Sequence, residues 1–204
     1  MLALGYFFCN IFSSAENYAR ILCMKYLYSL KFTILYILLI PAVNMLLIHA
    51  PFYNFAPNVY YTPASLLIGF IYVFRDFSQR ELGKGKVLIP MSIAAALTYA
   101  LGSPHMATAS LIAFAAGELT DWAVYTLTKR PLSRRIFLSG LIAIPVDIVI
   151  ILIGLKYASP GAMPINAMNM GLMFASNMSS VVLIYFIVKK LEARGMIKPR
   201  EEVT

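Results

Sequence analysis

Apolar residues along the chain gather in long runs that short polar connections separate, and this pattern predicts helices. The runs, in chain order, are Phe32–Ala50, Pro63–Phe77, Val87–Leu101, Met106–Leu127, Ile136–Tyr157 and Met170–Val188. A helix needs about 20 apolar residues to cross the hydrocarbon core of a bilayer, and the runs approach this length, although the second and third have only fifteen residues each. Polarity does not alternate every second residue, as it does in the strands of a membrane β-barrel. We therefore expect an all-α fold, a polytopic membrane bundle of about six transmembrane helices.

The two short runs raise the alternative of a re-entrant pair that enters and leaves the membrane on one side. The connection between them, from Arg75 to Lys86, carries four basic residues, which are Arg75, Arg80, Lys84 and Lys86. A charge at the middle of the bilayer is costly. We therefore expect both short runs to cross the membrane and this connection to lie outside it.

Basic residues are distributed unevenly between the two sides of this alternating arrangement. Of the 17 Lys and Arg residues, all but Lys156 fall before the first run, in the second-to-third or fourth-to-fifth connection, or after the sixth run. The opposite connections, Pro51–Thr62, Gly102–His105 and Ala158–Asn169, hold none. Because basic residues favour the cytoplasmic side, the pattern predicts a multi-pass protein of the plasma membrane (the bacterial inner membrane) with both termini in the cytoplasm.

The same pattern divides the chain into three parts. We expect an N-terminal cytoplasmic or interfacial segment at residues 1–30, a transmembrane domain at residues 31–190 and a short basic cytoplasmic tail at residues 191–204. The first segment has two alternative interpretations. It is an interfacial helix with Tyr and Phe at head-group depth, or it reflects start-codon choice, since Met24 would also serve as a start. A seventh membrane span in this segment would disrupt the placement of the basic residues on one side of the membrane.

The composition of the chain indicates that lipid surrounds part of its surface. The chain is 60% hydrophobic and 13% charged, with a mean hydropathy of +0.76, whereas soluble proteins carry about 25% charged residues. A net charge of +8 would indicate nucleic acid in a soluble chain, but here the basic residues cluster at the ends of apolar runs. This favours anionic lipid head groups, and we expect no nucleic-acid partner. Cys9 and Cys23 lack metal-ligand spacing, so we expect no metal site and no cofactor.

Three carboxylates inside the apolar runs, Glu118, Asp121 and Asp147, are the first candidates for a functional site. An ionisable group at mid-helix costs at least about 2.5–3.5 kcal/mol on insertion scales, so it marks a functional site by default. Glu118 and Asp121 are three residues apart and share one face of the predicted helix. Tyr125 and Phe114 extend this face in the two directions.

Two interpretations of these carboxylates stay open. In the first, they pair with Arg75 or with lysines at helix ends and hold the bundle together, and Asp76 takes part near the membrane edge. In the second, they bind a solute, because a carboxylate pairs well with two parallel N–H donors such as those of guanidinium or of a guanine-like base. Buried carboxylates also suit proton coupling. Asn177, in the sixth run, is a further candidate for solute contact.

The order of the polar blocks resembles a known family. The segment Arg75–Gly83 reads RDFSQRELG, Ala109–Phe114 leads into Gly117–Tyr125, and Ser139 and Asp147 follow on the next predicted helix. With these blocks in this order, the stretch from about Phe32 to Arg194 resembles the VUT family of vitamin uptake transporters, which includes queuosine precursor transporters.

The resemblance implies a six-helix inner-membrane carrier for a small purine-like substrate, such as the 7-deazaguanine bases preQ0 and preQ1. It carries over as site residues Arg75, Asp76, Glu118, Asp121 and Asp147. Aromatic rings at Phe114, Trp122 and Tyr125 would stack on such a flat solute. Trp122 is equally well placed for the aromatic belt at a membrane interface.

Other function classes fit the sequence less directly. The main alternative is a substrate-binding membrane subunit for another vitamin-like solute, driven by a separate ATPase. The segment Gly83–Lys86 does not have the spacing of a Walker motif, so ATP would have to act through a partner. No HExxH or GxSxG motif indicates an enzyme, and a structural role would leave the carboxylates unexplained. Energy coupling, the exact cargo and the oligomeric state, a homo-oligomer included, stay open.

Overall fold

The computed structural model describes residues 29–49, 53–101, 107–158 and 165–197. The chain divides after Lys31 into two units, Met1–Lys31 and Phe32–Thr204. The first unit falls almost wholly outside the described residues, and both interpretations of residues 1–30 fall outside them too. The end of the predicted basic tail, residues 198–204, also lies outside.

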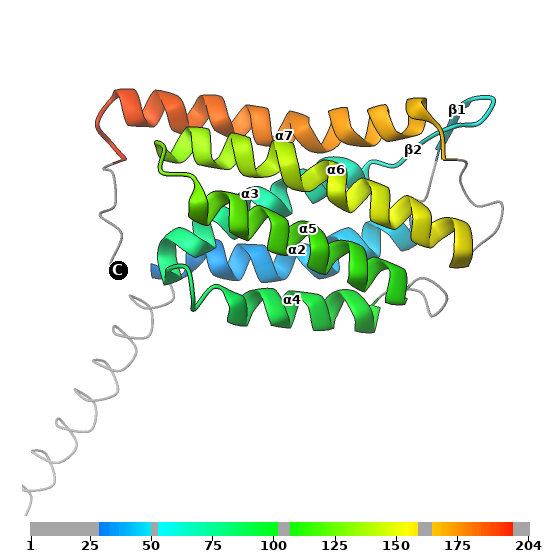
Figure 1. Cartoon of the computed structure of the whole chain (residues 1–204), viewed down its shortest axis with the longest axis horizontal. Coiled ribbons are helices and arrows are strands. Elements are labelled where there is room, and N and C mark those ends of the chain that lie inside the picture. Colours follow the sequence, from blue (N-terminus) through cyan, green and yellow to red (C-terminus); the bar gives the residue numbers. More distant parts are fainter. Residues whose placement is uncertain (1–28, 50–52, 102–106, 159–164, 198–204) are drawn as a thin grey trace, which may run out of the picture. The chain divides into compact units, whose positions relative to one another are not determined.

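Six helices and one β-hairpin make up the described part of the chain (Figure 1). In chain order they are α2 Lys31–His49, β1 Tyr53–Ala56, β2 Val59–Tyr61, α3 Ala64–Leu82, α4 Leu88–Leu101, α5 Ala107–Leu127, α6 Leu132–Ala158 and α7 Ala167–Ala193. Each predicted apolar run coincides with one helix, which confirms the expectation of a mainly helical fold. Successive helices run in opposite directions, so the basic connections 83–87 and 128–131 lie at the end of the bundle where α7 also ends.

Small side chains allow close contacts between neighbouring helices. Helix α5 packs against α4 and α6, and α7 packs against α6 and α3. A Cβ on Gly154 of α6 would overlap Ala109 of α5, and a Cβ on Gly140 would lie 3.1 Å from Val181 of α7. Buried apolar residues fill the remaining space in two cores, of which the large members include Ile136, Ile144, Ile148 and Leu152 in one and Tyr36, Ile40, Ile71 and Met91 in the other.

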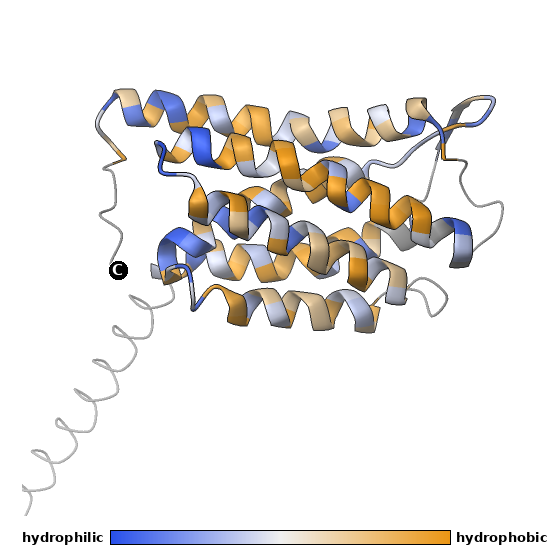
Figure 2. Cartoon of the chain, viewed as in Figure 1, coloured by the Kyte–Doolittle hydropathy of each residue, from blue (hydrophilic) through white to orange (hydrophobic). Residues whose placement is uncertain are grey.

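Two of the described helices are long and apolar enough to cross a membrane, namely α6 over Leu132–Gly154 and α7 over its whole length. Helices α2 and α4 are apolar but shorter. Figure 2 shows hydrophobic residues along the lengths of the helices and hydrophilic residues gathered towards their ends. Length and composition thus agree with a membrane protein.

The predicted connection Pro51–Thr62 contains a β-hairpin that the apolar pattern did not predict. Strands β1 and β2 pair antiparallel, and Asn58 in the turn between them has a φ of 62°. Asn is one of the few residues other than Gly that adopt this left-handed conformation readily. The hairpin is held against α7, because the side-chain oxygen of Asn169 accepts a hydrogen bond of 2.9 Å from the backbone N–H of Tyr60.

The predicted connection between the second and third runs begins too early. Helix α3 continues to Leu82, so Arg75 lies within the helix, and the connection starts at Gly83, whose φ is 89°. The helix persists beyond the apolar run because its polar side chains bond to other helices. Glu81, for example, accepts hydrogen bonds of 3.0 and 2.9 Å from two backbone N–H groups in the first turn of α2.

Candidate functional site

The C-terminal half of α3 carries charged residues into the interior of the bundle. Arg75 and Asp76 are 0% and 1% exposed, and Glu118 and Asp121 of α5 are 2% and 0% exposed. These four side chains contact one another, and we call them the inner charge cluster. The three-residue spacing that places Glu118 and Asp121 on one face of α5 brings both carboxylates to the same guanidinium.

Arg75 is the centre of the inner charge cluster. Its Nη2 lies 3.0 Å from Oδ1 of Asp76, and its Nε lies 3.6 Å from Oε2 of Glu118. A third ion pair joins Nη2 to Oδ2 of Asp121. The structure therefore contains the ion pairs between the carboxylates and Arg75 that the first interpretation requires. One guanidinium, however, faces three carboxylates, so negative charge is in excess.

Hydroxyl and amide groups from three helices support the cluster. Ser139 of α6 donates a hydrogen bond of 2.9 Å to Oδ2 of Asp76, and the hydroxyl of Tyr36 of α2 donates one of 3.1 Å to Oε2 of Glu118. Arg75 donates from Nη1 to Oε1 of Gln79 at 2.7 Å. Tyr36 and Gln79 were not predicted as site residues, and the one signal for Tyr36 is that a phenol within an apolar run needs a hydrogen-bond partner when it is buried.

Tyr125 extends the cluster towards the end of the bundle that holds the basic connections, as its spacing from Asp121 predicts. Its ring centroid lies 5.9 Å from the guanidinium carbon of Arg75 and 4.0 Å from that of Arg135. Arg135 also donates two hydrogen bonds to the backbone carbonyl of Tyr125. Both cations are attracted to the negative face of the ring, so Tyr125 separates two arginines and its ring is already engaged.

Asp147, the third carboxylate within the apolar runs, stands apart from the inner charge cluster. Its carboxylate accepts a hydrogen bond from the hydroxyl of Tyr72 of α3. Gly117 of α5 makes room for this pair, since a Cβ there would lie 2.5 Å from the Tyr72 hydroxyl and 3.1 Å from Cβ of Asp147. Among the described residues, no Lys, Arg or His forms an ion pair with Asp147. Tyr72 was not predicted as a site residue.

Asn177 of α7 is 1% exposed, and neither atom of its amide has a hydrogen-bond partner within the described part of the chain. A Cβ on Gly69 of α3 would overlap the backbone carbonyl of Asn177. Asn177 therefore lies at a close crossing of α3 and α7. A buried amide without partners is costly, so this side chain has unused capacity for a ligand.

The two remaining aromatic candidates have structural contacts. Phe114 packs against the core of α2, α3 and α4. Trp122 donates a hydrogen bond of 2.8 Å from Nε1 to the backbone carbonyl of Lys84 in the connection between α3 and α4. This contact places Trp122 at the end of the bundle, as the interfacial interpretation of this residue requires.

The chemistry of the interior follows from its excess of acceptors. Oε1 of Glu118 and Oδ1 of Asp121 are buried without a hydrogen-bond partner among the described residues. Such oxygens accept from N–H donors of a solute or hold protons. No group of three or more His, Cys, Asp or Glu residues in the described ranges could hold a metal ion.

Comparisons of the chain with models of known protein families, with curated proteins and with solved structures found no match.

Proposed function

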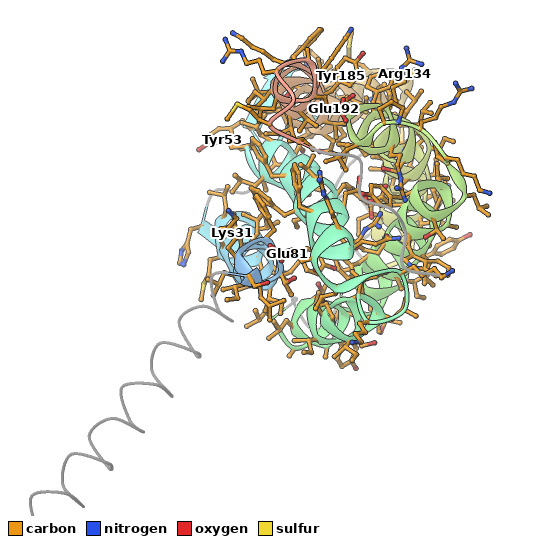
Figure 3. The ribbon with its side chains drawn as sticks, turned by 90° about the vertical axis from the view of Figure 1, so that its left-hand side faces the viewer. Lys31, Tyr53, Glu81, Arg134, Tyr185 and Glu192 are labelled. Carbon is orange, nitrogen blue, oxygen red and sulfur yellow. The ribbon has the colours of Figure 1, made fainter. Side chains whose placement is uncertain are left out.

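We propose that this chain is a multi-pass protein of the plasma membrane, with six membrane-crossing helices and both ends of the transmembrane domain in the cytoplasm. Large apolar side chains are exposed on every helix, as at Leu38, Leu66, Ile89, Ile112, Ile153 and Phe186. Exposed apolar surface of this extent needs a lipid or protein cover. Figure 3 views the bundle along its helices from the end where Glu81, Arg134 and Glu192 lie, the end that the positive-inside rule assigns to the cytoplasm.

The function that fits this interior best is import of a small purine-like base, with the queuosine precursors preQ0 and preQ1 as the first candidates. The observation that carries the proposal is the inner charge cluster. Replacing a buried ion pair by apolar residues is often neutral or stabilising, so stability alone does not account for four charged side chains inside an apolar bundle. Intramembrane charges of this kind serve a passing solute or proton by default.

The chemistry of the bundle interior also narrows the class of solute. Within the described part of the chain, four carboxylates lie inside the bundle, at Asp76, Glu118, Asp121 and Asp147, against one buried guanidinium at Arg75. Acceptor-rich surroundings favour a neutral or cationic solute with several N–H donors and disfavour an anion. A 7-deazaguanine base is flat and offers a ring N–H beside an exocyclic amine, and the order of polar blocks that resembles the VUT family supports the same class.

Feeding labelled preQ0 or preQ1 to a bacterium that cannot make queuosine de novo, with and without this chain, tests the proposal. We expect queuosine in tRNA only in cells that carry the chain. Glu118→Gln and Asp121→Asn should greatly reduce uptake, while Glu192→Gln, which changes a carboxylate outside the cluster, should not. Absence of tRNA queuosine while the protein is present in the membrane would refute the assignment of preQ0 or preQ1 as the transported solute. Uptake into vesicles that contain this chain alone would exclude an obligatory ATPase partner.

A further inference from the structure

The intramembrane polar groups fall into two sets with different freedom to bind a solute. Every carboxylate of the inner charge cluster has Arg75 as a cation partner. Asp147 has no cation partner among the described residues, is only half-buried and is bonded to the hydroxyl of Tyr72. The carboxylate of Asp147 is therefore not engaged by a cation in the described structure and is available to a ligand, whereas those of the cluster are already bound to a guanidinium.

Helix geometry brings Asn177 to the same region as Asp147. On α7, Ser180 donates a hydrogen bond of 2.7 Å to the backbone carbonyl of Leu66 in α3, and Val181 packs against Gly140 of α6. Residues three and four apart share a helix face, so Asn177 lies on the face of α7 that contacts α3 and α6, one turn nearer the end where the hairpin lies.

Tyr72 and Asp147 come from the two helices, α3 and α6, that this face of α7 contacts. Tyr72 follows Gly69, the residue in contact with Asn177, by three positions on α3. Asp147 of α6 bonds to the Tyr72 hydroxyl beside Gly117 of α5, where a Cβ would lie 3.1 Å from Cβ of Asp147. Tyr72 thus connects Asp147 to the helix that Asn177 crosses one turn earlier at Gly69, and we call Tyr72, Asp147 and Asn177 the outer polar group.

We infer that the outer polar group is the solute-binding site and that the inner charge cluster is not required for binding. The inference rests on the proposed function and adds to it which residues recognise the solute. A carboxylate beside an amide suits a flat heterocycle with a lactam edge. Asp147 accepts from the ring N–H and exocyclic amine, while the amide of Asn177, which has no partner in the described structure, donates to a carbonyl or accepts from a donor.

Binding measurements on the purified full chain in lipid nanodiscs separate the two sets. The probes are radiolabelled guanine, preQ1 and hypoxanthine, which lacks the exocyclic amine. We expect Asp147→Asn and Asn177→Ala to bind guanine about tenfold more weakly or worse, because each loses a hydrogen bond to a desolvated group. Glu118→Gln should bind guanine within about twofold of wild type while failing in uptake. Asn44→Ala is the control and should also bind guanine within about twofold of wild type, because the described hydrogen bond of the Asn44 side chain goes to the backbone of its own helix.

A preference test makes the assignment sharper. Wild type should bind guanine more tightly than hypoxanthine, and Asp147→Asn should lose this preference, because the carboxylate that accepts from the amine is gone. Tyr72→Phe, which removes one hydroxyl only, serves as a second variant if Asp147→Asn does not fold, and thermal melting of each variant monitors folding. Wild-type binding by the Asp147 and Asn177 variants, with loss in Glu118→Gln, would overturn the inference and leave the carrier in place. No binding of any probe by the wild type, together with no uptake, would overturn the proposed function itself.

Discussion

Gly117 is the position at which one added methyl group gives the most direct test of the packing around the outer polar group. In Gly117→Ala the new Cβ would lie 2.5 Å from the hydroxyl oxygen of Tyr72, 3.1 Å from Cβ of Asp147 and 3.5 Å from Cζ of Tyr72. The first distance is far below van der Waals contact, and the second is tight. The phenol ring is rigid, so its hydroxyl moves only if α3 or the whole side chain shifts.

The size of the effect follows from two opposing contributions. Overpacking of a filled interior costs about 1–3 kcal/mol, while replacing Gly by Ala in a helix gains up to about 1 kcal/mol. Gly171 of α7 provides the matched control, because a Cβ there meets nothing within 4 Å. Gly117→Ala should therefore be less stable than Gly171→Ala by about 1–3 kcal/mol, a difference in melting temperature of about 2–12 °C for a chain of this length.

A second substitution identifies the atom responsible. Tyr72→Phe removes the hydroxyl and its hydrogen bond, which should cost about 0.5–1.5 kcal/mol on its own. In the Gly117→Ala background the same change also removes the clash, so the double variant should be more stable than the sum of the two single effects predicts. Circular dichroism melting in detergent measures all four proteins. Equal melting of Gly117→Ala and Gly171→Ala, or additive effects in the cycle, would refute this packing.

Three further predictions follow from other contacts. Arg75→Met should destabilise the chain by about 3–5 kcal/mol, because buried carboxylates lose their partner, and adding Asp121→Asn should recover part of this in thermal melting. Glu81→Ala should cost about 1–2 kcal/mol, since three hydrogen bonds to the first turn of α2 disappear, whereas Glu81→Gln should cost less. In a background without native cysteines, a membrane-impermeant maleimide applied to intact cells should label Pro57→Cys in the hairpin but not Lys129→Cys, and the reverse labelling would invert the proposed topology.

The helices could be predicted from the sequence because a long apolar run is a local property, but their ends could not. Helix α3 extends past its apolar run to Leu82 because Gln79, Glu81 and Asp76 bond to α5, α2 and α6. Those partners are remote in the sequence and leave no local signal. The β-hairpin at β1 and β2 was missed for the same reason, since its bonds to Asn166 and Asn169 lie more than a hundred positions away.

Half of the site was predictable from spacing and half was not. Glu118 and Asp121 share a face by helical periodicity, and an arginine was among their expected partners. Tyr36 lies 82 positions before Glu118, and Tyr72 joins Asp147 only because Gly117 lets three helices approach. Periodicity describes one helix at a time, so the division between an inner charge cluster and an outer polar group emerges only when the helices are packed together.

The excess of carboxylates connects these observations to the proposed transport function. A single guanidinium offsets one carboxylate charge, and Arg75 faces three, so lowering the net charge of the cluster requires protons. The cluster is assembled from α3 and α5 and held by hydroxyls of α2 and α6, so a displacement of any of these helices changes how many carboxylates Arg75 can reach. Proton occupancy of the cluster and helix arrangement are therefore coupled by charge balance. A carrier that alternates between two arrangements needs such a coupling, and a bundle held by apolar packing would not provide it.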